Sequence, residues 1–350
     1  MNTSVDEKVI LEAMDKPAFY VQNGKITEIN NAAKQYLIPP GEDIRELLIT
    51  GQQEYEAFTD GSLYLSVSVF GTPWDCTVTR LSDKDLFTLE IVPRHQQLQT
   101  LARASAHLRL PLSDMVVTIE RMDTKNDPMY PRLNRTIYQL QRIVSNMSDA
   151  SLLLSTAPNL TECDICSPFR EALEKATVLL KHAGIELKYS VPAGAIRGFA
   201  ERDLISRAVY NLLSNAVKYA QAGEKLTAEL TQKGKLLCFT VTGGQCKEPA
   251  AQEQFFKGYA REPGIAGYPS GLGLGITIVH TAASAHGGTV LVQQTPGQST
   301  RVTMTLQIEK TGSSETVRTS ILIPDSYGGR DSALVELSDV LPSSLYSGEF

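Results

Sequence analysis

The feature that most constrains the fold of this chain is a pair of apolar stripes between Gln96 and Leu154. In the first stripe, apolar or small residues recur alternately three and four positions apart: Leu98, Leu101, Ser105, Leu108, Leu112, Met115, Ile119 and Met122. After a break at Lys125 to Pro128, the spacing returns at Leu133, Ile137, Leu140, Val144, Met147, Ser151 and Leu154. Such heptad spacing is typical of helices that pack along a seam. We therefore predict an antiparallel helical hairpin over residues 94–157.

Two helices with one apolar stripe each cannot enclose a core on their own. The economical solution is to pair two hairpins across a two-fold axis, which gives a four-helix bundle. We therefore expect the protein to form a homodimer through this hairpin.

The segment before the hairpin, residues 1–93, is expected to form a small antiparallel sheet. AFYVQ, Asn23-Gly24 and KITEIN form a hairpin signature with a type I′ turn. Three further runs rich in β-branched and aromatic residues, LYLSVSVF, WDCTVTRL and LFTLEIV, follow after a short helical stretch near Asn31 to Leu37.

After the hairpin, residues 158–310 alternate helix-like and strand-like patterns. Helices are expected near residues 168–183 and 203–220 and before Ala285, and strands at IELKYSV, LTAELTQ, LLCFTVTG, TVLVQQT and TRVTMTLQI. This order predicts a two-layer α/β domain. The whole chain is thus an α+β multidomain protein, with residues 311–350 as a C-terminal extension.

Composition and charge exclude some classes of function. The net charge of −6 provides no basic surface for nucleic acid. The chain lacks an apolar run of about 18 residues and a signal-peptide pattern at residues 1–16, so we expect a cytoplasmic protein without a transmembrane segment. Five scattered cysteines are expected to be reduced thiols. Cys163 and Cys166 have zinc-like spacing, but no second ligand pair accompanies them.

Two motifs in the α/β domain resemble those of the sensor histidine kinases of two-component signalling. NLLSNAVKYA, Asn211 to Ala220, is similar to the N box of that family, and SGLGLGITIV, followed by AHGG at residues 285–288, is similar to its second glycine box. Phe255 to Tyr259 resembles the F box, and residues 261–270 would be the lid. The resemblance covers residues 10–310 and implies a PAS-like sensor, a dimerisation hairpin and a GHKL-type ATP-binding domain.

The motif residues suit a site for Mg²⁺ and ATP. Asn211 and Asn215 lie four positions apart, so their amide oxygens share one helix face and can meet a hydrated Mg²⁺ between phosphates. By resemblance, Asn215 is the main magnesium ligand, Lys218 adds positive charge towards the phosphates, and Tyr219 lies beside it. Glycines permit close approach of phosphate to the backbone, and the helix after them offers free N–H donors; these glycines are Gly271, Gly273 and Gly275.

The first glycine box departs from the family pattern. The family has D-x-G-x-G, in which the aspartate binds the adenine amino group, whereas this chain has GGQCK at residues 243–247. The loss of one charge-assisted hydrogen bond weakens affinity about tenfold to a hundredfold. ATP binding is therefore expected to be weak or lost.

The phosphoacceptor motif also departs from the family pattern. The family's H box reads S-H-E-L-R-T-P-L, and this chain has S-A-H-L-R-L-P-L from Ser105 to Leu112. Pro111 matches the kink proline, so the acceptor position falls on Ala106, and His107 stands where the family has glutamate. One residue along a helix turns a side chain by about 100° and moves it about 1.5 Å. His107 is then either a displaced phosphoacceptor, if the helix unwinds locally at Pro111, or an exposed surface histidine.

Three functions remain to be weighed. A degenerate relative that acts as a dimeric signalling scaffold is favoured by the two altered motifs. The alternative is an active kinase that phosphorylates His107 and then a response regulator. An ATP-driven GHKL machine would need a general-base glutamate where Asn211 stands. In the extension, SILIP is a candidate strand and ALVELSDVLP a candidate short helix that packs on the nucleotide side, although a disordered tail is the other reading.

Overall fold

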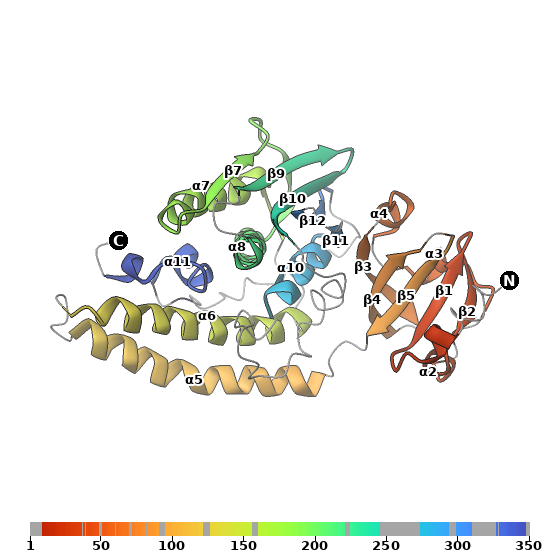
Figure 1. The fold of residues 1–350 in the computed structure, drawn as a ribbon, viewed down its shortest axis with the longest axis horizontal. Coiled ribbons are helices and arrows are strands. Elements are labelled where there is room, and N and C mark those ends of the chain that lie inside the picture. The colour runs from red at the N-terminus through yellow and green to blue at the C-terminus, as the bar shows by residue number, and fades with distance from the viewer. Residues whose placement is uncertain are drawn as a thin grey trace.

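The computed structural model describes residues 9–36, 38, 40–48, 51–59, 61–69, 72–81, 83–90, 95–121, 127–155, 160–220, 225–245, 274–293, 299–309, 327 and 329–347. In this part of the chain an N-terminal sheet, a long helical hairpin and a second α/β unit follow one another (Figure 1). The C-terminal segment returns to lie between the hairpin and the second unit.

The N-terminal unit is a five-stranded antiparallel sheet with the order β2-β1-β5-β4-β3. Its elements are β1 (Ala18–Gln22), β2 (Lys25–Ile29), α2 (Asn31–Lys34), α3 (Ile44–Leu47), α4 (Gln52–Glu56), β3 (Ser62–Val69), β4 (Thr72–Arg80) and β5 (Asp85–Glu90). Asn23 and Gly24 have φ angles of 54° and 77°, which a type I′ turn requires. The predicted β-hairpin is thereby confirmed, whereas α3 and α4 were not predicted.

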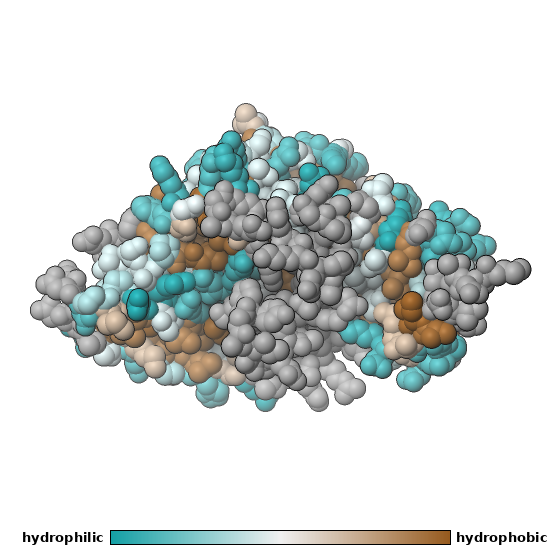
Figure 2. Space-filling view, viewed as in Figure 1, coloured by the Kyte–Doolittle hydropathy of each residue, from teal (hydrophilic) through white to brown (hydrophobic). Residues whose placement is uncertain are grey.

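The hairpin consists of α5 (His95–Arg121) and α6 (Tyr130–Ser155), packed along each other. Among the predicted seam positions whose side chains the structure describes, only some are buried within the chain. Leu112 and Ile119 of α5 pack against Ile137 and Val144 of α6. The intervening seam positions are exposed, at 45% for Leu108, 51% for Met115, 48% for Leu133 and 41% for Leu140. Figure 2 shows hydrophobic residues gathered along the lower left of this view, where the hairpin lies in Figure 1.

The second unit places helices on one face of a sheet with the order β11-β12-β10-β9-β7. Its elements are β6 (Thr161–Asp164), α7 (Cys166–His182), β7 (Glu186–Ser190), β8 (Arg197–Ala200), α8 (Arg202–Tyr219), β9 (Lys225–Lys233), β10 (Leu236–Gln245), α10 (Leu274–Ala285), β11 (Val290–Gln293) and β12 (Ser299–Gln307). Every helix and strand predicted for residues 160–309 is present within a few residues of its expected bounds, and β6 and β8 form an additional small sheet.

A junction between the two sheets was not predicted. β3 pairs antiparallel with β11, so the described strands of both units form one ten-stranded sheet. Gly61 makes the close approach possible, because a Cβ at this position would lie 2.6 Å from the carbonyl oxygen of Val292. Leu291 of β11 packs against the core of the N-terminal unit.

The AHGG motif fixes the end of α10 against the start of α8. The buried ring of His286 accepts a hydrogen bond from the backbone N–H of Glu201 through Nε2 (3.0 Å) and donates from Nδ1 to the carbonyl of Ala282 (2.6 Å). These partners require the neutral ring with its proton on Nδ1. Gly287 has a φ of 69°, and a Cβ at Gly288 would overlap the carbonyl of Thr305. The two glycines therefore let the chain turn directly from α10 into the sheet.

The His286 contacts predict a dependence of stability on pH. Burial lowers the pKa of His286 below the ordinary value of 6.5. The unfolded chain therefore takes up a proton on this ring as the pH falls below about 6.5 while the folded chain does not, and stability falls. In urea unfolding, we expect the free energy of unfolding of wild type to fall by about 1 kcal/mol more than that of His286→Gln when the pH is lowered from 7.5 to 5.5. The exposed His182 provides the control, because His182→Gln should behave as wild type; equal losses in wild type and His286→Gln would contradict this assignment.

Candidate functional site

The N-box residues lie on α8 beside the start of α10. Asn211 is fully buried, and Asn215 and Lys218 are partly buried. A Cβ at Gly275 would lie only 2.7 Å from Oδ1 of Asn211, so the structure brings this glycine of the second glycine box against the N box. Gly271, Gly273 and the side chain of Tyr219 lie outside the described residues, as do the predicted F box and lid.

Helix α6 of the hairpin also reaches the N-box face. Arg142 of α6 donates from Nη2 to Oδ1 of Asn211 (3.0 Å) and from Nη1 to Oγ of Ser214 (3.4 Å). One helical turn further on, Asn146 accepts a hydrogen bond from Arg207 of α8 (3.2 Å). Polar side chains of α6 and α8 therefore meet directly in a buried layer.

The C-terminal segment closes this layer with a fully buried carboxylate. Glu336 lies at the end of α11 (Ser332–Glu336) and accepts four hydrogen bonds. Its Oε1 accepts from Arg207 Nε (3.1 Å) and from the hydroxyl of Tyr327 (2.7 Å). Its Oε2 accepts from Arg142 Nε (3.2 Å) and from Nδ2 of Asn211 (3.2 Å). Burial, followed by the charge of Glu336, raises the pKa of Tyr327 well above 10, so this hydroxyl stays a donor.

A second carboxylate of the same segment meets Lys218. One oxygen of Asp339, Oδ2, accepts from Lys218 Nζ (2.7 Å) and from Arg142 Nη1 (2.6 Å). Burial alone would raise the pKa of Asp339, but the charges of Arg142 and Lys218 outweigh this effect and lower it. Asp339 is therefore ionised at neutral pH and neutralises part of the positive charge beside α8.

Apolar packing and backbone contacts hold the segment in place. Its buried apolar residues belong to the core of the second unit: Ala333, Leu334, Leu337, Leu341, Leu345 and Tyr346. Side chains of α6 donate to its carbonyl groups, including Asn134 to Tyr346 (2.8 Å) and Arg135 to Ser338 (2.9 Å). The 3-10 helix η1 (Ser343–Tyr346) lies against α6. There the ring centroids of Tyr346 and Tyr138 are 4.8 Å apart. Within the described part of the extension, the predicted short helix is present as α11, and SILIP lies outside the described residues.

The residues at this face suit an oxyanion. Lys218 and Arg142 converge on one carboxylate oxygen, and such paired cationic donors bind phosphate oxygens equally well. Asn215 stands on the same helix, four residues after Asn211. The adenine end of the site fits less well, because β9 and β10 contain no aspartate among residues 225–245. Bound ATP would be held through its phosphates by Lys218 and through Mg²⁺ by Asn215, and it would supply a transferable phosphoryl group.

The H box lies on α5, away from these contacts. The side chains of Ala106 and His107 are both exposed, and α5 continues as α-helix across Pro111. Pro111 has no N–H, so the carbonyl of His107, four residues earlier, receives no helical hydrogen bond from it. Two residues after the proline, the hydroxyl of Ser113 donates to the carbonyl of Arg109, one turn before it (2.9 Å).

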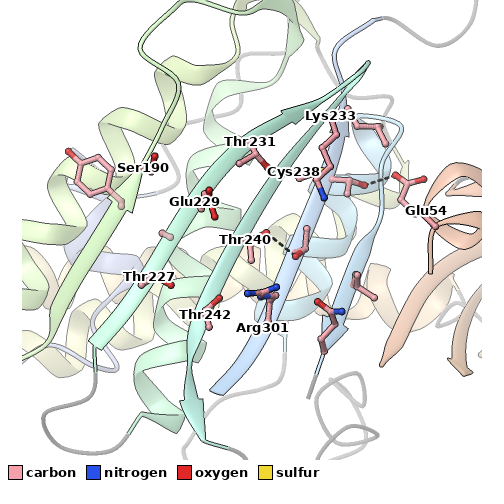
Figure 3. Close-up of a pocket in the computed structure, with 18 of the residues that line it drawn as sticks. Glu54, Ser190, Thr227, Glu229, Thr231, Lys233, Cys238, Thr240, Thr242 and Arg301 are labelled. Atoms are coloured by element: carbon pink, nitrogen blue, oxygen red, sulfur yellow. Dashed lines mark hydrogen bonds between the residues drawn. The ribbon is translucent and has the colours of Figure 1, made fainter. Parts of the chain in front are cut away.

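Other candidate sites carry less chemistry. Cys163 and Cys166 are free thiols, and no three or more potential metal ligands of the His, Cys, Asp or Glu type gather anywhere in the described residues. A hollow on the outer sheet face is lined by a mixture of hydroxyl-bearing, charged and apolar residues, among them Thr227, Thr231 and Thr242 (Figure 3). None of the described helices is long and apolar enough to cross a membrane.

Sequence reasoning singled out Asn211, Asn215, Lys218 and Gly275 but did not identify the residues that surround them from elsewhere in the chain. These are Arg142, Arg207, Glu336 and Asp339. A signal was present on α6, where Asn134, Tyr138, Arg142 and Ser145 form a polar stripe at helical spacing beside the apolar seam. Its partner could not be read from the sequence, because the contacts span up to 212 positions.

Comparison with known proteins gives a family match and several similar curated proteins. Residues 200–310 match the family model described as histidine kinase-, DNA gyrase B-, and HSP90-like ATPase. The sensor histidine kinase RppB of Synechocystis sp. is 27% identical over 224 residues, which cover 61% of this chain and 49% of RppB. The sensor-like histidine kinase SenX3 of Mycobacterium tuberculosis is 30% identical over 151 residues, which cover 43% of this chain and 37% of SenX3.

Solved structures of histidine kinases also match. Full-length ShkA in complex with AMPPNP is 20% identical, with a TM-score of 0.49, and the match covers 61% of this chain and 47% of ShkA. The chain matches about half or less of the length of RppB and of SenX3. Asn211 of the N box and Gly275 of the second glycine box meet between α8 and α10, and residues 200–310 belong to the histidine kinase-, DNA gyrase B-, and HSP90-like ATPase family, in a chain that is similar to two-component sensor histidine kinases.

Proposed function

We propose that this protein is a homodimeric scaffold in two-component-type signalling whose histidine autophosphorylation is strongly reduced or absent. The observation that carries the proposal is the continuity of α5 across Pro111. Local unwinding at the proline would be needed to move His107 into the acceptor position, and the helix is not unwound there. Ala106 therefore keeps the position that the family resemblance assigns to the phosphoacceptor.

The geometry of phosphoryl transfer disfavours a histidine that stands one residue after the acceptor position, as His107 does. The attacking nitrogen and the transferred phosphorus must lie in line, and a side chain turned by about 100° on a helix leaves that line. The glutamate that follows the family's acceptor is also missing, because His107 itself occupies that place. Weak retention of adenine, expected from the altered first glycine box, supports the same proposal.

The alternative function, an active kinase with His107 as acceptor, has one observation in its favour. The imidazole of His107 is exposed on α5 and thus accessible to a catalytic domain. A response regulator would then receive the phosphoryl group on an aspartate. In the scaffold reading, the partner is a response regulator or another signalling protein that reads the conformation of the hairpin, and the N-terminal antiparallel sheet with its short helices serves as a PAS-like sensor.

Autophosphorylation separates the two readings. Full-length protein is incubated with radiolabelled ATP and Mg²⁺ and then treated with acid or alkali, because phosphohistidine is lost in acid. We expect wild type to retain no more acid-labile label than His107→Ala. The matched comparison is the double variant Ala106→His with His107→Glu, which restores the family order. Acid-labile label on wild type at an ordinary kinase rate, abolished in His107→Ala, would contradict the proposal.

The homodimer proposal is supported by the described seam residues that the chain leaves exposed. Leu108 and Met115 of α5 are seven residues apart, as are Leu133 and Leu140 of α6, so each pair forms a stripe along one helix. Both stripes adjoin the buried seam positions. A second copy packed in the same way would cover all four side chains and complete a four-helix bundle.

Substitution of this stripe predicts a change of oligomeric state. Leu108→Glu combined with Met115→Glu places charges in the proposed interface, and we expect the protein to become monomeric in light scattering after size exclusion. Leu110 is 75% exposed and lies on the opposite side of α5, so Leu110→Glu should stay dimeric. A wild-type monomer at micromolar concentration would rule out this assembly.

A further inference from the structure

The C-terminal segment places its two carboxylates against the N-box face of α8. Glu336 binds the amide of Asn211, and Asp339 binds the ammonium group of Lys218. The family resemblance assigns this face to Mg²⁺ and the phosphates of ATP. The segment therefore brings negative charge to the place where a nucleotide would bring it.

The contacts of Asn211 leave little capacity for a second ligand. Its Oδ1 accepts from Arg142, while its Nδ2 donates to Glu336 and to the carbonyl of Arg207 (2.9 Å). Both ends of the amide are thus engaged, and the side chain is fully buried. This oxygen keeps a second lone pair, but the guanidinium charge of Arg142, 3.0 Å away, opposes the approach of a cation such as Mg²⁺.

The contacts of Lys218 lead to the same exclusion. Lys218 and Arg142 hold one oxygen of Asp339 at 2.7 and 2.6 Å, so the carboxylate occupies the space between the two cations. A phosphate group that used both cations would overlap that carboxylate, and one that approached beside it would meet its negative charge. The phosphate chain and the segment can thus not use this face together.

We propose that Tyr327 and residues 329–347 form a tethered competitor of Mg²⁺-bound nucleoside triphosphate at the N-box face of α8. The segment and the nucleotide exclude each other, and nucleotide binds after the segment has left. Because the segment also contacts α6, its departure removes the Glu336 contact between the hairpin and the catalytic-like unit. This inference rests on the nucleotide site that the family resemblance implies and is independent of whether His107 accepts a phosphoryl group.

The tether adds to the strength of the competition. A segment of the same chain is present at a high effective concentration, so a nucleotide must outcompete it at every encounter. The measured dissociation constant then equals the intrinsic one divided by the fraction of molecules in which the segment has left. A substitution that weakens the segment contact should therefore tighten nucleotide binding.

Asp339→Asn tests the exclusion in the full-length protein. This side chain is 21% exposed, and Asn keeps its shape while removing the charge that meets Lys218 and Arg142. In a titration with a fluorescent ATP analogue and Mg²⁺, we expect Asp339→Asn to bind about three to ten times more tightly than wild type. The matched control is Asp331→Asn, which removes a charge from the same segment that pairs with Lys175, while Asn still caps α11. The control should bind as wild type does.

A second measurement needs no substitution. Hydrogen exchange of wild type is followed with and without saturating Mg²⁺ and AMPPNP, and we expect backbone amides of residues 332–346 to exchange faster when the nucleotide is bound. Binding to Asp339→Asn no tighter than to Asp331→Asn, unchanged or slower exchange in residues 332–346, or no Mg²⁺-dependent binding to any of these proteins would overturn the proposal. The autophosphorylation assay fails or succeeds separately, since it tests α5 and not the segment.

Discussion

The described arrangement of the hairpin and the second α/β unit depends on the buried carboxylate of Glu336. Two arginines from different helices, Arg142 and Arg207, are almost completely removed from water and would be strongly destabilising without a counter-charge. Glu336 supplies that charge and takes four donors at once, which satisfies its oxygens. Removal of one partner from such a buried pair costs about 3–5 kcal/mol. The cluster therefore holds α6, α8 and the C-terminal segment together.

This cluster gives the C-terminal extension a structural role, whereas its sequence predicted only a short helix that packs on the nucleotide side. In many chains a short helix at a terminus would only cover apolar surface, and the leucines of this segment do so. Its carboxylates, however, contact Asn211 and Lys218, to which the family resemblance assigns magnesium and phosphate. The same segment thus holds α6 against α8 and, in our proposal, also occupies the face that would bind the phosphates of a nucleotide.

The sequence predicted most elements because each local pattern agreed with its tertiary use. The alternation in residues 225–245 produced paired strands, and Asn23-Gly24 adopted the two left-handed conformations that its turn needs. The N box and Gly275 came together as the motifs implied. Long-range polar contacts were different, because no periodicity links Arg142 to Glu336 across 194 positions. The pairing of β3 with β11 was not predicted for the same reason, because a strand pattern in the sequence does not identify the neighbouring strand.

The pairing of β3 with β11 also has a consequence for the behaviour of the protein in a crowded cell. Each strand would otherwise be the open border of its sheet, with unpaired backbone groups able to recruit strands from other molecules. Joined, the two borders protect each other from aggregation. Detachment of the N-terminal unit would therefore expose two unpaired strand edges at once. The resistance of the chain to aggregation thus depends on the pairing of β3 with β11.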